Sequence, residues 1–454
     1  MWRKILVILL VAVSANFWGC SSGGDGGRTF GPATVLQQGN TDAADVTVAM
    51  NRLGDGIALW AQDDGTGNYR IWANYFRLGL WLGPRAAQED TVEGLCPRVT
   101  IDDEGNAVLV WLRYESTGMY HLWSRRYRFL TGTWDTARRI QSGVGASKDP
   151  QISVDPFGNA VVVWTQDDGT GFSVTQAIRY SAATDTWGAA QVVETAAGDC
   201  QFPQVKTDAL GNAVAIWMQT NGSGIFDIRF SRFSAATSSW GDPGLVETDA
   251  GNAANPKLAM LPNGSAFAVW HQDDGSGFDQ VMANYLPVGL NWQGSVNIQG
   301  GTIATSSYTS VAADASGNVI ALWREYDGAG EDDDSGQYTL RSAHFSARMG
   351  NWGTPSSILR GTDEISLPDL GVDAAGNAGA VWLQVAAGSN NIVRVSIRYG
   401  DSLLWSAAAA MQSGTDDTIC PTIAVSNGQI LAVWLQDDGT GSGIRKVMAS
   451  RSFF

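Results

Sequence analysis

The chain contains few of the residues on which most catalytic and metal sites depend. It has 454 residues but only three histidines, His121, His271 and His344, which lie far apart in the sequence. None has a second histidine or a cysteine two or four positions further on, so the spacing of a zinc site is absent. Beyond residue 28, the serine elbow of hydrolases and the phosphate-binding P-loop are missing as well. The sequence therefore predicts a protein that is not an enzyme.

Basic residues are also scarce. Lysine and arginine together number 29 against 45 aspartates and glutamates, and the formal net charge is -16. An acidic surface of this kind repels nucleic acid and anionic lipid headgroups, so no nucleic-acid partner is expected. The charge serves either solubility alone or the attraction of cations, basic partners or neutral sugars.

Helical patterns are missing beyond the first twenty residues, whereas tryptophan is abundant and regular. Eight of the 19 tryptophans recur at intervals of 51 to 59 residues: Trp60, Trp111, Trp164, Trp217, Trp270, Trp323, Trp382 and Trp434. A second series follows about 23 residues behind: Trp81, Trp134, Trp187, Trp240, Trp292, Trp352 and Trp405. A period of this size in a glycine-rich chain indicates a repeat fold whose unit is one small sheet. We interpret both series as core residues.

The third repeat shows the unit most clearly. Strand-like segments at 150–155, 160–164, 174–180 and 189–193 are separated by turns rich in glycine and aspartate. Four antiparallel strands in about 53 residues make one blade of a β-propeller.

The two ends of the sequence predict that the ring is closed. The eighth unit stops at Phe454, before its fourth strand, and residues 29–36 match residues 186–193 with Phe30 in the place of Trp187. An N-terminal strand that completes the last unit closes a ring and removes exposed sheet edges. The sequence therefore predicts an all-β, eight-bladed β-propeller of four-stranded antiparallel blades, one domain over residues 29–454.

A short turn motif recurs before the hydrophobic second strand of most units. Asp-x-x-Gly-Asn starts at Asp102, Asp155, Asp208, Asp314 and Asp373. The motif and its flanks resemble the repeats of NHL-type and related bacterial propellers, a resemblance that implies the propeller fold. The sialidase aspartate box and the WD and kelch signatures are absent.

The N-terminus has the features of a targeting segment. Arg3 and Lys4 precede an apolar run over residues 5–13, too short to span a bilayer, and Cys20 opens a Gly/Ser-rich stretch. This arrangement resembles a bacterial lipoprotein signal. The resemblance implies a signal peptide over residues 1–19, lipidation at Cys20, a tether over residues 20–28 and, by analogy with enteric bacteria, the outer membrane. Ordinary cleavage after Ala15 is the alternative.

Three further cysteines, Cys96, Cys200 and Cys420, cannot form a complete set of disulfides because their number is odd. Cys96 and Cys420 occupy the same position two units apart, which is too far for a bond in a large ring. We interpret all three as small buried apolar residues.

Acidic loops are the candidate binding sites. Gln-Asp-Asp-Gly turns between second and third strands supply the pairs Asp63/Asp64, Asp167/Asp168, Asp273/Asp274 and Asp437/Asp438. Consecutive aspartates offer the hard oxygen ligands that Ca²⁺ prefers, so a calcium cofactor is possible. The alternative is turn formation alone, because Asp-Gly is a strong hairpin signal.

The sixth unit carries a longer loop than the others. Its surplus falls at 327–336 and supplies the candidate ligand-binding residues Asp327, Glu331, Asp332, Asp333 and Asp334. The loop is either a tolerated insertion or a site for a cation or a basic partner.

These observations predict a non-enzymatic scaffold of the cell envelope, a monomer that binds a protein or glycan partner on its acidic loop face. A glycan-binding lectin is the alternative, and a polysaccharide hydrolase or lyase is a third reading.

The lipid anchor gives the first testable prediction. Replacement Cys20→Ser removes the acylated thiol, so the protein should move from the membrane fraction to the soluble fraction on cell fractionation. A variant that stays with the membrane, or a wild-type protein that is already soluble, would contradict the lipoprotein interpretation.

Overall fold

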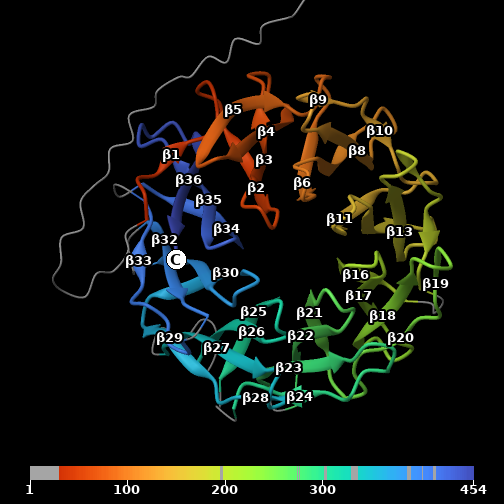
Figure 1. Ribbon diagram of the computed structural model, residues 1–454, viewed down its shortest axis with the longest axis vertical. Helices are drawn as coiled ribbons and strands as arrows, with labels where there is room; N and C mark the ends of the chain where they lie inside the picture. Colours follow the sequence, from red (N-terminus) through yellow and green to blue (C-terminus); the bar gives the residue numbers. More distant parts are fainter. Residues whose placement is uncertain are drawn as a thin grey trace, which may run out of the picture.

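The computed structural model describes residues 30–194, 198–273, 275, 277–300, 304–328, 336–385, 390–400, 402–412 and 416–454. Eight small sheets stand around a central axis, each with its first strand innermost (Figure 1). The fold is therefore the predicted eight-bladed propeller. The predicted signal peptide, Cys20 and the tether lie outside the described residues. Among the described residues, no helix is long and apolar enough to cross a membrane.

The first four blades follow one another along the chain. Blade 1 contains β2 (Ala43–Met50), β3 (Gly56–Asp63), β4 (Tyr69–Arg77) and β5 (Leu80–Ala86). Blade 2 contains β6 (Gly94–Ile101), β7 (Ala107–Tyr114), β8 (Tyr120–Arg128), β9 (Thr133–Trp134) and β10 (Arg138–Arg139). Blade 3 contains β11 (Ser147–Val154), β12 (Ala160–Asp167), β13 (Ser173–Ser181), β14 (Thr186–Trp187) and β15 (Gln191–Val192). Blade 4 contains β16 (Cys200–Thr207), β17 (Ala213–Thr220), β18 (Phe226–Ser234), β19 (Ser239–Trp240) and β20 (Gly244–Leu245).

The remaining blades repeat the pattern. Blade 5 contains β21 (Ala253–Met260), β22 (Ala266–Asp273), β23 (Asp279–Leu286) and β24 (Val296–Asn297). Blade 6 contains β25 (Thr305–Ala313), β26 (Val319–Tyr326), β27 (Tyr338–Ser346), β28 (Asn351–Trp352) and β29 (Ser356–Gly361). Blade 7 contains β30 (Glu364–Val372), β31 (Ala378–Val385), β32 (Asn391–Arg398) and β33 (Ala409–Ala410). Where five strands are present, the fourth strand is split into two short pieces that both pair with the third.

The last blade joins the two ends of the described chain. It contains β34 (Thr418–Ser426), β35 (Gln429–Asp437) and β36 (Arg445–Phe453), and β1 (Thr34–Val35) pairs with β36 as its fourth strand. Thr34 lies opposite Ala449, and the amide of Leu36 donates to the Val447 carbonyl at 2.8 Å. The predicted ring closure is confirmed.

The tryptophans of the second strands form the core between blades. All eight are at most 1% exposed, whereas the tryptophans of the second series are half-buried. In six blades the indole N–H donates to a Gln or Glu oxygen two residues further on, as from Trp164 to Gln166 at 3.1 Å. The Gln166 amide then donates to the Ser142 carbonyl in the preceding connection at 2.7 Å. A buried N–H needs such an acceptor, which explains the glutamine of the repeated turn.

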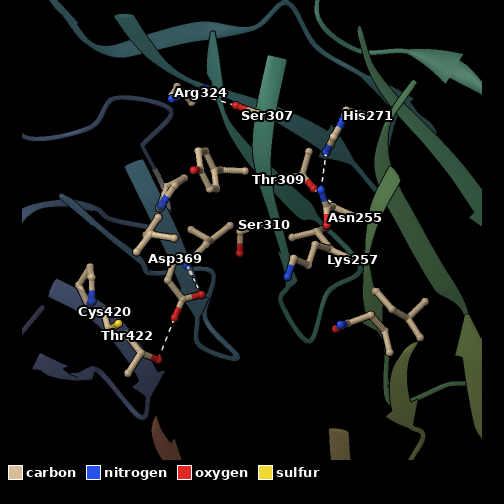
Figure 2. A pocket seen from close by; sticks show the side chains of 18 of the residues that line it. Asn255, Lys257, His271, Ser307, Thr309, Ser310, Arg324, Asp369, Cys420 and Thr422 are labelled. Atoms are coloured by element: carbon tan, nitrogen blue, oxygen red, sulfur yellow. Dashed lines mark hydrogen bonds between the residues drawn. The ribbon is translucent and has the colours of Figure 1, made fainter. Parts of the chain in front are cut away.

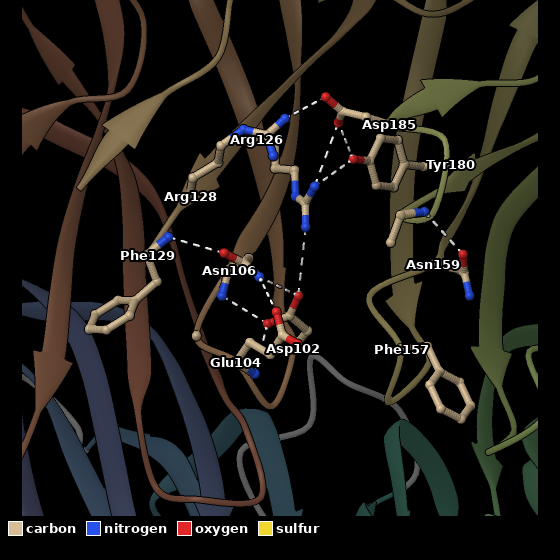
Figure 3. Close-up of polar contacts among 12 residues, drawn as sticks. Asp102, Glu104, Asn106, Arg126, Arg128, Phe129, Phe157, Asn159, Tyr180 and Asp185 are labelled. Atoms are coloured by element: carbon tan, nitrogen blue, oxygen red, sulfur yellow. Dashed lines mark hydrogen bonds and ion pairs between the residues drawn. The ribbon is translucent and has the colours of Figure 1, made fainter. Parts of the chain in front are cut away.

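In the five blades that carry it, the Asp-x-x-Gly-Asn motif stabilises the turn between the first and second strands and contacts the neighbouring blade (Figure 3). The Asp155 carboxylate accepts hydrogen bonds from the amides of Phe157 and Asn159, both at 2.9 Å. The Asn159 side-chain oxygen accepts from the Ala182 amide at 3.0 Å and so joins two turns of one blade. A Cβ on Gly158 would lie 2.9 Å from Asp102 Oδ2 in the preceding blade, so only glycine fits this approach. The motif is therefore structural.

Loss of the asparagine gives a prediction about stability. Replacement Asn159→Ala leaves the Ala182 amide without its acceptor and removes the bond to Asp155, so the free energy of unfolding should fall by about 1–3 kcal/mol. Denaturant unfolding measures the change. The exposed Asn291 provides the matched control, since Asn291→Ala should alter stability by less than about 0.5 kcal/mol. Equal effects of the two replacements would contradict this role of the motif.

Candidate functional site

A cavity of about 750 Å³ lies on the propeller axis, where the innermost strands converge. This volume is within the range of about 300–1,000 Å³ found for small-molecule sites. Its walls come from the first strands of seven of the eight blades and from two second strands, β22 and β26. Figure 2 shows the lining side chains of blades 5 to 8 around this cavity.

A β-bulge interrupts every first strand at the same point. At each bulge a residue other than glycine has a positive φ: Asp45 (51°), Cys96 (50°), Asp149 (51°), Phe202 (48°), Asn255 (49°), Tyr308 (54°), Leu367 (48°) and Cys420 (52°). In six blades the next residue is proline, which lacks an N–H and so suits the unpaired position of a bulge. Such backbone costs on the order of 1 kcal/mol or more per residue and clusters at functional sites. Four bulge residues, Asn255, Tyr308, Leu367 and Cys420, line the cavity.

The cavity is cationic although the protein is acidic. Arg98, Lys206, Lys257 and Arg324 line it, and Asp369 is the one carboxylate among its lining residues. Both carboxylate oxygens of Asp369 already accept hydrogen bonds, from Thr422 Oγ1 at 3.0 Å, from the Ile423 amide at 3.1 Å and from the Leu370 amide at 2.9 Å. The lining therefore carries an excess of positive charge, which favours an anionic ligand.

The two lysines are held in a region poor in bulk water. Lys206 is exposed to the cavity and Lys257 is half-buried, yet the surrounding blades exclude water and lower the pKa of both amines from the ordinary value of 10.5. The Asp369 carboxylate opposes this effect, while Arg98 and Lys206 lower the pKa of Lys257 further. Positive charges in such proximity gain from a bound anion.

His271 on β22 lies in the wall with its two ring nitrogens in different surroundings. Nε2 accepts a hydrogen bond from the Asn255 side-chain amide at 2.9 Å, and Nδ1 lies 3.5 Å from the Asp279 carboxylate. The carboxylate favours the proton on Nδ1, which leaves the lone pair on Nε2. His271 is thus oriented with its basic nitrogen towards a cavity residue.

Arg324 and Tyr308 form the adjacent wall in blade 6. The Arg324 guanidinium lies over the Tyr308 ring, 4.9 Å from its centroid, and Nε donates to Ser307 Oγ at 2.9 Å. Arg324 is buried and its Nη1 lies 3.9 Å from the Glu364 carboxylate, whereas Tyr308 is 40% exposed. The wall therefore presents a phenol next to a fixed guanidinium.

The predicted loop residues have local roles in the structure. Asp63 Oδ1 accepts from the amides of Gly65 and Gly67, at 2.8 and 3.0 Å, and Asp64 Oδ1 accepts from Thr66. The same turn bonds involve Asp167, Asp168, Asp273, Asp437 and Asp438. Hydrogen bonds of this kind stabilise the turn, which explains why aspartate recurs at these positions.

Two of the predicted acidic clusters lie only partly within the described residues. Asp274, Glu331, Asp332, Asp333 and Asp334 lie outside the described residues. Asp327 is described, and its carboxylate accepts from the Gln337 amide at 2.6 Å and pairs with Arg360 at 2.9 Å. Within the described ranges, no group of three or more His, Cys, Asp or Glu side chains could hold a metal ion. Calcium binding at the Asp-Asp-Gly turns stays a prediction.

The interpretation of the cysteines needs a correction. Cys200 is buried as expected, but Cys96 is only half-buried and Cys420 is exposed; all three are free thiols. Cys96 and Cys420 differ from a core residue because both stand at bulges of the inner ring, and Cys420 lines the cavity.

The axial cavity was not predicted from the sequence. His271 and Arg324 both directly follow the repeated tryptophan, where the other blades have Ala61, Leu112, Thr165, Met218, Leu383 and Leu435. A comparison of this one position across the repeats would have singled out blades 5 and 6. Arg98 and Lys257 share a second such position, two residues after the bulge, where the other blades have Thr47, Gln151, Gln204, Ser310, Asp369 and Thr422. Lys206 carries no comparable signal.

The fold is shared with solved structures at low sequence identity. A polysaccharide lyase, Uly1, superimposes with a TM-score of 0.50 and 10% identity over 78% of this chain and 89% of the other. A ulvan lyase of polysaccharide lyase family 25 gives a TM-score of 0.49 and 9% identity over 90% and 93% of the two chains. The α-L-arabinanase of Penicillium chrysogenum gives 0.44 and 16% over 68% and 94%. No protein-family model and no curated protein matches the sequence.

The prediction that the protein is not an enzyme is contradicted by the comparison with Uly1. That chain shares the fold at a TM-score of 0.50 and is a polysaccharide lyase. The prediction assumed that catalytic residues would be visible as motifs. Ring closure instead brings His271, Tyr308 and four cations from four different blades to one cavity, so scattered residues are no argument against catalysis.

The thiols give a prediction about access to this cavity. Among the described thiols, Cys420 should react fastest with a neutral aromatic disulfide because it is the exposed one, although burial and the nearby Asp45 carboxylate raise its pKa. Burial raises the pKa of Cys200 to about 12, so this thiol should react only after unfolding. The absorbance of the released thiolate measures the rates. Cys420→Ser should remove the fastest phase and Cys200→Ser should not; an unchanged fast phase in Cys420→Ser would place the accessible thiol elsewhere.

Proposed function

We propose that the protein cleaves an acidic, uronate-containing polysaccharide by β-elimination in the axial cavity, at the outer membrane to which lipidated Cys20 would tether it. One observation carries the proposal: four cations converge on a cavity that also holds a histidine and a tyrosine suited to proton transfer. A uronate carboxylate is the anion that a sugar polymer brings to such a site.

The lining favours elimination over hydrolysis. Most glycoside hydrolases use two carboxyl groups about 5–10 Å apart on either side of the scissile bond. Among the described lining residues, Asp369 is the one carboxylate, and its oxygens are engaged by Thr422, Ile423 and Leu370. Elimination needs cations to neutralise the substrate carboxylate and one base, which the cavity supplies.

The groups present allow the reaction to be written in full. Arg324 and Lys257 pair with the uronate carboxylate and stabilise the negative charge that develops when C5 loses its proton. His271 Nε2 takes that proton once the substrate displaces Asn255. The C5–H electrons form the C4=C5 double bond, the C4–O bond breaks, and Tyr308 gives its phenolic proton to the departing oxygen. Water then carries the proton from His271 back to Tyr308.

The acidic exterior does not prevent a polyanion from reaching this cavity. At physiological ionic strength, charges on the surface are screened beyond about 8 Å. The cations of the lining are screened less because the blades exclude water around them. The local field of the cavity therefore decides binding, and the net charge of -16 mainly maintains solubility.

The direct test is incubation with pectate, alginate and ulvan. Elimination should produce ultraviolet absorbance from the unsaturated uronate together with new reducing ends. His271→Ala should lower kcat by about 100-fold or more, as expected for loss of a general base, while Lys446→Met on the outer part of blade 8 should leave it unchanged. New reducing ends without the absorbance would indicate hydrolysis. Saturable binding with no bond cleavage would indicate a lectin, and neither signal would contradict the proposal.

The lysines predict the pH dependence of substrate binding. Because the pKa of Lys206 and of Lys257 is below 10.5, both amines lose their positive charge at a lower pH than an ordinary lysine. Affinity for an acidic oligosaccharide should therefore be full at lower pH and fall as the pH rises, before it reaches the range in which an ordinary lysine loses its proton. Calorimetric titration at several pH values measures this, and an affinity that rises with pH would contradict it.

A further inference from the structure

We infer that the acidic chain enters the cavity end-on, along the propeller axis, so that the protein acts on chain ends rather than within chains. The substrate class of this inference rests on the proposed function. Its geometry rests on the positions of the four cations along the propeller axis.

The register of the strands gives the depth of each cation. The repeated tryptophan marks the same level in every blade, and Arg324 stands one residue beyond Trp323, towards the face that carries the loops between second and third strands. Lys257 lies opposite Val269, one residue before Trp270. Arg98 is at the same level as Lys257, because it lies opposite Val110, one residue before its tryptophan. Lys206 lies furthest from that face, opposite Val214, three residues before its tryptophan.

The cations therefore descend into the cavity in steps of two residues. A strand rises about 3.3 Å per residue, so one step is about 7 Å and the whole descent about 13 Å. A chain lying flat across the upper face would meet Arg324 and leave Lys206 out of reach. A chain directed along the axis meets Arg324, then Lys257 and Arg98, and then Lys206.

The opposite wall suits a sugar chain in this orientation. Leu367, Pro368, Leu370 and Pro421 from blades 7 and 8 line the cavity across from the lysines. Asp369, the acidic residue among those described on that wall, already accepts hydrogen bonds from other residues of the protein. Lys206, Lys257 and Arg324 on blades 4 to 6 and the apolar groups on blades 7 and 8 match the carboxylate edge and the apolar face of a uronate.

The position of the reactive groups then fixes where the chain is cut. His271, like Arg324, directly follows its tryptophan and so lies at the upper level, with Tyr308 at the neighbouring bulge. Sugar units below this level occupy the lysine region during cleavage. The product should therefore be one short oligosaccharide of uniform length released from a chain end.

The test measures how the effect of each lysine depends on ligand length. Oligogalacturonates from the monomer to the hexamer are titrated by calorimetry against wild type, Lys257→Met and Lys206→Met, with Lys446→Met as the matched control. Lys257→Met should weaken all lengths by about tenfold. Lys206→Met should leave the monomer unaffected and weaken the longer ligands by about tenfold. The control should change nothing.

The outcomes separate this inference from the proposed function. A Lys206→Met effect equal for monomer and hexamer, no effect at any length, or no binding of any oligogalacturonate would overturn the end-on geometry. Where cleavage occurs, a uniform short product from the first time point supports it. A broad range of fragments with a rapid fall in viscosity overturns it while elimination itself stands. Where no cleavage occurs but Lys206 shows the length dependence, the end-on geometry stands and the proposed reaction fails.

Discussion

The pairing of β1 with β36 is the constraint on which the rest of the structure depends. It holds residues from opposite ends of the chain together, Thr34 against Ala449 and Val35 against Met448. Through this contact the last blade gains its fourth strand, and the ring closes with eight first strands around one axis. The axial cavity exists only because the ring is closed, since its lining comes from blades at both ends of the chain.

In the closed ring, the residues that build the scaffold differ from the residues that line the cavity. The repeated tryptophan and the Asp-x-x-Gly-Asn turn recur because every blade has to pack against the next one. The inner-strand bulge recurs in all eight blades, but its residue varies from Asp45 to Tyr308 and Cys420. Constant geometry with variable side chains lets one fold present different groups around a single cavity. The cationic lining comes from Arg98, Lys206 and Lys257, which follow the bulges on their first strands, and from Arg324 on a second strand.

Much of the fold could be predicted because its signals are periodic. The tryptophan spacing gave the number of blades, and the match of Phe30 with Trp187 gave the closure. The site could not be predicted in the same way, because the lining takes between one and six residues from each of seven blades and no local motif contains them. The acidic turns were predicted as binding sites because Asp63 and its equivalents repeat. Their carboxylates instead accept hydrogen bonds from backbone amides of the same turn. Repetition in this chain indicates structure, and departures from it, such as His271, indicate function.

The most direct test of the account is a crystal structure of the protein soaked with an acidic oligosaccharide. The account predicts electron density within the axial cavity, with one carboxylate between Arg324 and Lys257, a further carboxylate beside Lys206, and the sugar chain along the axis. Density on the acidic loops or on the outer strands, with the cavity occupied by solvent alone, would contradict it.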